Sequence, residues 1–302
     1  MSKDFKIFGM SYGLLGDLVM GLPLLTYYEK KYPGSYKFWV IEKKCAISAP
    51  LYFNHPLIDR IKITDEWGKL GEGDKEIRAQ CDVHTVREGW KHSSKQWYNY
   101  KSCVEETAIL AGVYDITEVL SKKELRPKLY KWFDEGFFNE RCHTYTREHI
   151  KDINYFGDNI AIWPFATATG GNRSPSVSWW EEVINKLIFY GYNVYHYGRN
   201  TEPDLCTLPR YKRFTHLSYF EQVKAALASR LCIGTDSGSM WVMGAYAHPA
   251  VHIMTNWLPG HNKNFMALEP VNERGVSLFE EGGCDNVKPE AVVKQVKEIF
   301  LL

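Results

Sequence analysis

Apolar runs alternate with amphipathic stretches along the first 65 residues, which is the pattern of strands followed by helices. The apolar segments predict three strands, over 5–10, 36–42 and 59–64. Between the first two, leucine and valine recur at helical spacing from residue 18 to 25, and Pro23 predicts a kink in that helix. Residues 70–150 are less regular, with one predicted helix over 95–112 that ends at Gly112.

The second half shows the same alternation more clearly. It predicts strands over 159–165, 192–198, 230–236 and 249–254. Ser178 with Glu181, and Ser218 with Glu221, have capping-box spacing, so we expect one helix from 178 to Gly191 and another from 218 to about Ser229. A further helix is expected to open at 237, and an amphipathic one over 288–302 closes the chain.

Strands that alternate with crossover helices form parallel sheets, and ligands bind outside the carboxyl ends of such strands. The pattern restarts near residue 158, and 302 residues exceed what one small core needs. We therefore predict an α/β protein of two doubly wound, Rossmann-like domains, 1–155 and 156–302, that face a central cleft.

Charge and cysteine content narrow the function classes. The net charge of +1 gives no overall field toward nucleic acid or anionic membranes. The seven cysteines are odd in number and widely spaced, which favours neither a zinc site nor a disulfide framework. We see no apolar stretch typical of a signal peptide or a membrane span, so we expect a cytoplasmic protein.

The first strand leads into a glycine-rich turn that carries an acid. Gly13 and Gly16 allow close approach of the backbone to a ligand, and Asp17 stands where the helix begins. Asp17 is open to two interpretations, a functional carboxylate or a simple N-cap. Residues 9–16 loosely resemble a dinucleotide fingerprint that opens at Gly9, with Glu42 as a ribose partner. An NAD(P)-dependent oxidoreductase is therefore an alternative, although the spacing differs from G-x-G-x-x-G.

Two loops of the second half carry groups suited to a nucleotide. The loop after the strand at 159–165 offers the hydroxyls of Thr167 and Thr169 and the guanidinium of Arg173, a set that suits a diphosphate. The loop after 192–198 offers Glu202. This residue is a candidate acceptor for ribose hydroxyls or, alternatively, a solvated loop acid.

The most informative stretch is the join at 235–239. An apolar strand ends there and a helix begins at once, so backbone N–H groups of Gly238 and Ser239 and the hydroxyl of Ser237 are placed to cradle a phosphate. Asp236 is suited to hold a sugar hydroxyl or a cationic side chain. Capping alone is the other interpretation of this pattern.

Three segments together resemble a known family. Residues 13–44, 54–63 and 220–251 resemble, in order and separation, family 9 of the glycosyltransferases, the bacterial heptosyltransferases. The resemblance implies a GT-B fold, with the acceptor on the N-terminal domain and the donor nucleotide on the C-terminal one. It also raises the prospect that the last helix packs back on the N-terminal domain.

The resemblance further implies the reaction. A sugar passes with inversion from a nucleoside diphosphate sugar to an acceptor hydroxyl on a glycan or lipopolysaccharide-like molecule, without a metal or other cofactor. Asp17 matches the family's candidate general base. Trp241 stands where the family usually has histidine, and it is predicted to contact the donor; Arg173 stands where the family often has lysine. These departures leave open a binding protein without catalytic activity on the same scaffold.

A last stretch, 86–101, interleaves lysine and arginine with tryptophan and tyrosine. This composition suits a glycan, a nucleic-acid strand or an anionic acceptor, but a solvated amphipathic face has the same composition. A DNA-modifying glycosyltransferase stays open on this basis. The near-neutral charge of the chain argues against strong binding to a duplex.

Overall fold

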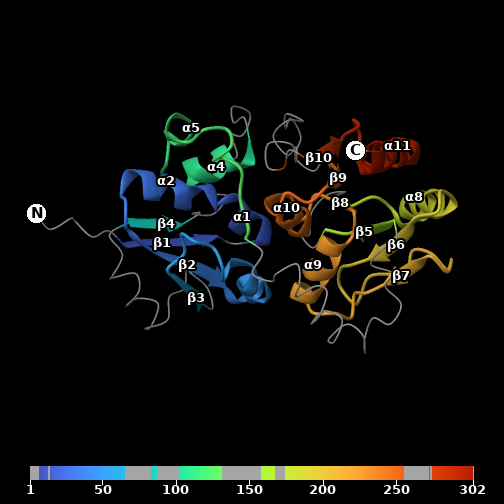
Figure 1. Ribbon diagram of the computed structural model, residues 1–302, viewed down its shortest axis with the longest axis horizontal. Coiled ribbons are helices and arrows are strands. Elements are labelled where there is room, and N and C mark those ends of the chain that lie inside the picture. The colour runs from blue at the N-terminus through green and yellow to red at the C-terminus, as the bar shows by residue number, and fades with distance from the viewer. Residues whose placement is uncertain are drawn as a thin grey trace, which may run out of the picture.

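Two parallel β-sheets, each covered by its own helices, build the computed structural model (Figure 1). The structure describes residues 7–12, 14–64, 83–86, 102–130, 158–166, 174–254, 272 and 274–301. The predicted division between 155 and 156 lies outside these residues and stays a prediction. The predicted parallel α/β architecture is confirmed.

The first sheet has the strand order β3-β2-β1-β4, and all its strand pairs are parallel. Its strands are β1 (Ile7–Tyr12), β2 (Tyr36–Glu42), β3 (Arg60–Thr64) and β4 (Val83–Val86). Its helices are α1 (Leu15–Met20), α2 (Pro23–Lys31), α4 (Cys103–Leu110) and α5 (Ile116–Val119), with the 3-10 helix η1 (Lys43–Tyr52). The consecutive apolar residues 38–41 of β2 are all buried, as expected for a strand that is covered on both faces.

Pro23 divides the predicted first helix into two. The chain leaves α1 at Gly21, and Pro23 opens α2, because a proline that cannot donate a backbone hydrogen bond is tolerated in the first turn of a new helix. Asp115 holds α2 in place, since it accepts hydrogen bonds from the Tyr27 hydroxyl at 2.6 Å and from Lys31 at 2.7 Å. Of the helix expected over 95–112, the described part is α4, and 95–101 lie outside the described residues.

The second sheet has the order β10-β9-β8-β5-β6-β7, again with parallel pairs. Its strands are β5 (Asn159–Trp163), β6 (Asn193–His196), β7 (Tyr211–Arg213), β8 (Leu231–Thr235), β9 (Ala250–Ile253) and β10 (Gly275–Leu278). Its helices are α8 (Val177–Phe189), α9 (Tyr219–Ala228), α10 (Gly238–Ala245) and α11 (Pro289–Leu301), with the 3-10 turn η3 (Cys284–Asn286). The central strands β5 and β8 are buried along their whole length.

The two predicted capping boxes have different outcomes. The one at Ser218 and Glu221 is confirmed in both its hydrogen bonds and starts α9. The one at Ser178 is wrong: α8 is capped by Ser176, whose hydroxyl accepts the N–H of Trp179. The backbone N–H of Ser176 itself donates to Asp285 at 2.6 Å, and this tertiary contact accounts for a start two residues earlier.

The last helix belongs to the second domain. The apolar stripe of α11, which includes Val292, Val293 and Val296, packs against α8 and beside β9 and β10 (Figure 1). The contacts described for α11 lie within the second domain, and its packing on the N-terminal domain stays a prediction. Among the helices of the described ranges, none combines the length and apolar character needed to cross a bilayer.

One buried histidine makes the stability of the fold depend on pH. His252 lies on β9 and is fully buried, and within the described residues neither ring nitrogen meets a hydrogen-bond partner. Burial lowers its pKa from 6.5 to about 4. The neutral ring is therefore required by the folded state, whereas the unfolded chain takes up a proton below about pH 6.5.

We expect stability to fall as the pH drops from about 6.5 to about 4, since the unfolded state binds more protons in that window. His252 contributes about 1.4 kcal/mol of this loss per pH unit. In His252→Phe the slope of the unfolding free energy against pH becomes shallower by that amount, whatever the change in absolute stability. Urea unfolding at a series of pH values measures the slope, and an unchanged slope would contradict this account.

Candidate functional site

The two domains meet where α1 packs against α10, which lie side by side in the middle of the molecule (Figure 1). Two glycines make this contact possible. A Cβ on Gly238 would lie 2.8 Å from the Cβ of Leu15 and 3.1 Å from the backbone N of Gly16, and a Cβ on Gly16 would lie 3.2 Å from the Trp241 ring. The helices that follow the carboxyl ends of β1 and β8 are thereby held in van der Waals contact.

This contact brings Asp17 to the junction between the domains. Asp17 lies in the first turn of α1, directly after Gly16, and is 8% exposed. The N-cap position of α1 is held by Leu14, so the interpretation of Asp17 as a simple N-cap is wrong. Its carboxylate also lies near the thiol of Cys45 on η1. Burial raises the pKa of Cys45, and the negative charge of Asp17 adds to that rise.

The start of α10 differs from those of α8 and α9. Ser237 occupies the N-cap with an extended backbone, yet its side chain makes no capping hydrogen bond. The Ser237 hydroxyl is shielded from solvent, and the part of the chain that the structure describes offers it no partner. In α8 and α9 the serines at the same position do cap their helices. The hydroxyl of Ser237 is thus left for a group outside the helix.

Asp236 and Ser239 flank this serine. Asp236 is 5% exposed and follows the last residue of β8. Asp236 also lies near Cys284 of η3. Burial raises the pKa of the Cys284 thiol to about 11, and the negative charge of Asp236 adds a small part of that rise. Ser239 in the first helical turn lies next to the Tyr219 side chain.

Glu202 is buried rather than solvated, so that alternative is wrong. Its side chain is 4% exposed, and one carboxylate oxygen lies 3.0 Å from His196 Nε2. The other oxygen accepts the backbone N–H of Arg199 at 3.0 Å. The other nitrogen of His196 contacts the Tyr211 hydroxyl at 2.7 Å, which in turn accepts the backbone N–H of Leu205. Both carboxylate oxygens thus hold the loop after β6, and contact with a ribose stays a prediction.

Trp241 lies inside the domain junction. It is 3% exposed, packs on Gly16 and meets the His252 ring edge-on at a centroid distance of 6.1 Å. This position gives the indole a packing role between α1 and β9. Its expected contact with a donor stays a prediction.

The remaining predicted site residues, Gly13, Thr167, Thr169 and Arg173, lie outside the described residues. The stretch on either side of 167–173 is described, and Ala166 N–H donates to the Ser174 hydroxyl at 2.8 Å. This bond ties together the two ends of the segment close to the carboxyl end of β5. In the described ranges, no group of three or more histidine, cysteine or acidic residues is suited to hold a metal ion.

The dinucleotide interpretation of the first loop has little geometric support. The glycine that would open the fingerprint, Gly9, lies within β1 and is paired with Phe38 of β2, so it is not part of a phosphate-binding loop. Glu42 forms an ion pair with Lys44 at 2.6 Å. Its carboxylate therefore has a local partner at the end of β2.

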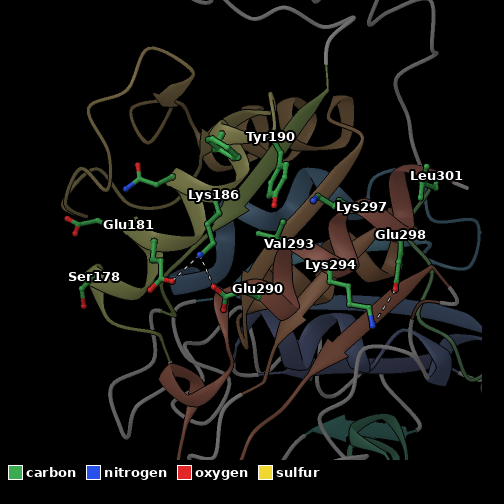
Figure 2. Close-up of a pocket in the computed structure, with 13 residues that line it drawn as sticks. Ser178, Glu181, Lys186, Tyr190, Glu290, Val293, Lys294, Lys297, Glu298 and Leu301 are labelled. Carbon is green, nitrogen blue, oxygen red and sulfur yellow. Dashed lines mark ion pairs between the residues drawn. The ribbon is translucent and has the colours of Figure 1, made fainter.

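A groove of about 910 Å³ lies elsewhere, between α8 and α11 (Figure 2). Several of its charged side chains pair with one another, as Lys186 does with Glu290 at 2.7 Å and Lys294 with Glu298 at 3.8 Å. Lys297 stands over the ring of Tyr190. These charges neutralise one another on the outer surface of the second domain, away from the contact between α1 and α10.

Solved structures share this architecture. The E. coli ADP-heptose lps heptosyltransferase II matches over 98% of this chain and 99% of its own, with a TM-score of 0.69 and 16% identity. A family 9 glycosyl transferase from Veillonella parvula matches over 100% and 99%, with the same TM-score and identity. The E. coli heptosyltransferase WaaC, solved with ADP, matches over 98% and 100%, with a TM-score of 0.63 and 13% identity. No protein-family model and no curated protein matches the sequence.

The chain therefore has the GT-B fold of two Rossmann-like domains, as predicted. Within that class its architecture is heptosyltransferase-like, and the resemblance seen in the sequence is confirmed at the level of the fold.

We expect removal of the Ser218 hydroxyl to lower the unfolding free energy more than removal of the Ser237 hydroxyl. Ser218→Ala deletes a capping hydrogen bond and should cost about 1 kcal/mol of unfolding free energy. Ser237→Ala removes a hydroxyl that caps nothing, so the cost should stay below about 0.5 kcal/mol. Urea unfolding of the two variants measures the difference, and an equal loss in both would show that Ser237 serves the helix after all.

Proposed function

We propose that this protein is a glycosyltransferase that moves a sugar from a nucleoside diphosphate sugar to the hydroxyl of an acceptor, with inversion. The observation that carries the proposal is the contact between α1 and α10. It puts Asp17 of one domain beside the start of α10 in the other, where Ser237 carries an unused hydroxyl. An acid and an anion-binding helix start are the two elements that this transfer needs.

In the proposed reaction Asp17 acts as the general base. It takes the proton from the acceptor hydroxyl while that oxygen attacks the anomeric carbon from the side opposite the diphosphate. A new C–O bond forms as the C–O bond to the diphosphate breaks, through an oxocarbenium-like state. Since attack and departure occur on opposite faces, the configuration at that carbon inverts.

The leaving diphosphate gains negative charge that has to be stabilised. We assign this role to the first-turn N–H groups of Gly238 and Ser239, with the Ser237 hydroxyl. Arg173, with Thr167 and Thr169, is proposed to assist from the loop after β5. The proposed reaction needs no metal, and its rate should be the same with and without EDTA.

The donor is tested by a melting screen. ADP-heptose is the first probe, because WaaC has been solved with ADP and with an ADP-linked fluoro-heptose. UDP- and GDP-linked sugars and NAD are the comparators. A ligand at 100 times its Kd adds about 2.7 kcal/mol of stability, which is a clear rise in melting temperature. A rise with NAD alone would favour an oxidoreductase, and binding without transfer to any acceptor would favour a binding protein.

Removing the proposed base should abolish turnover while the fold stays intact. We expect Asp17→Asn to lower the transfer rate by about 10²- to 10⁴-fold, because the amide cannot accept the proton. Its melting temperature and its donor affinity should stay close to those of the wild type. Asp204→Asn, at a carboxylate that is 69% exposed, is the matched control and should keep full activity. Normal turnover in Asp17→Asn would refute this role.

Loss of the Arg173 side chain should weaken binding of the donor but not of the acceptor. Arg173→Ala is expected to weaken donor binding about tenfold or more, since a charged hydrogen bond to a phosphate contributes about 1.5–3 kcal/mol. Acceptor binding should change less than twofold. Calorimetry with each substrate decides this, and equal losses for both would remove Arg173 from the donor site.

A further inference from the structure

Three tyrosine hydroxyls are buried where the two domains meet. Tyr52 ends η1 of the first domain, Tyr219 begins α9 of the second, and Tyr246 follows α10. η1 packs against α9, and α9 packs against α10, so elements of both domains bring these side chains to one seam. Tyr52 is fully buried, and the other two rings are partly buried against the same apolar cluster.

Within the described residues, none of the three hydroxyl oxygens has a hydrogen-bond partner, and all three are shielded from solvent. Ser48 lies near the Tyr52 hydroxyl and Ser239 near that of Tyr219, without completing a hydrogen bond. A buried polar group without a partner costs about 1–3 kcal/mol, and most buried hydroxyls in proteins are bonded. Three such groups at one seam call for a ligand that completes them.

The same hydroxyls lie between the two halves of the proposed active site. Burial raises the pKa of Tyr52, and the nearby Tyr219, Cys45 and Tyr246 add to that rise. Cys45 in turn lies within the field of Asp17. The tyrosines and Cys45 therefore lie close enough to influence one another electrostatically, and Cys45 is close enough to Asp17 for the same.

We propose that the hydroxyls of Tyr52, Tyr219 and Tyr246 form a saccharide subsite, which binds hydroxyl groups of the transferred sugar when substrate enters between the domains. This inference rests on the proposed function. A phenol both donates and accepts, as a sugar hydroxyl does, and its ring packs against the C–H face of a pyranose. A phosphate would be less well served, because the three hydroxyls bring no positive charge to the seam.

The test is a set of Tyr→Phe variants that keep the ring and remove the hydroxyl. For Tyr52→Phe, Tyr219→Phe and Tyr246→Phe, calorimetry measures the affinity for ADP-heptose and for ADP, and thermal unfolding measures stability. We expect each variant to bind ADP-heptose about three- to tenfold more weakly, as for one lost hydrogen bond, and ADP within twofold of the wild type. The melting temperature should stay the same or rise, because the deleted hydroxyl is unpaired in the unliganded protein.

Two further tyrosines serve as controls. Tyr211→Phe removes a hydroxyl that is bonded to His196 and Leu205, and it should lower the melting temperature. Tyr114→Phe, at a side chain that is 78% exposed, should change nothing. A lower melting temperature in the three seam variants would show that their hydroxyls hold the domains together, and this would overturn the inference. Unchanged affinity for ADP-heptose in all three would also overturn it.

Failure of the proposed function itself has a different signature. If the wild-type chain bound neither ADP nor ADP-heptose nor any other sugar nucleotide of the melting screen, the donor assignment would fail and the subsite with it. If another sugar nucleotide gave the larger melting shift, that compound and its own nucleoside diphosphate would replace the ADP pair. If the wild type binds the donor and the three Tyr→Phe variants bind it equally well, only the tyrosine subsite is refuted.

Discussion

The arrangement of this protein depends on the close contact between α1 and α10. Glycine at 16 and at 238 lets two helices from different domains approach until backbone meets backbone. Each helix follows the carboxyl end of a central strand, so this one contact brings the ligand-facing edges of two parallel sheets together. The acid on α1 and the first turn of α10 are then neighbours as a consequence of packing.

The site divides into groups held by packing and groups left without partners. Glu202 has both carboxylate oxygens engaged, so it ties the loop after β6 to that strand without a ligand. Gly198 is required there, since a Cβ would collide with the Glu202 carboxylate. In contrast, Ser237 and the tyrosines at the seam bury hydroxyls without partners among the described residues. Buried polar groups of this second kind are costly in a resting protein and become favourable when a ligand completes them.

Local sequence was enough to predict the elements whose stability is local. The apolar runs of β2, β5 and β8 and the capping box of α9 could be identified because burial and capping leave residue patterns within a few positions. The strands β4, β7 and β10 were missed, because each is short and polar residues interrupt its few apolar positions. The start of α8 was misplaced for a similar reason, since its N-cap is fixed by Asp285, over a hundred residues away.

Among the candidate site residues, Asp17 and the turn at 236–238 were identified from glycines and polar residues at strand ends. The burial of Glu202 and the packing of Trp241 were not, because His196 and Gly16, their partners, are set by tertiary contacts. Cys45 and Tyr52 carried no signal, since η1 has no helical periodicity that marks a buried face. Only the contact of η1 with α9 gives them a place at the seam.

The junction of Leu15 and Gly16 with Gly238 and Trp241 is built from apolar groups, and this has a consequence for how the domains respond to their surroundings. Ionic strength screens charges but leaves contacts of this kind almost unchanged. Cooling weakens them, because apolar association near room temperature is driven by the entropy of water. The relative position of the two domains should therefore be indifferent to salt and responsive to temperature.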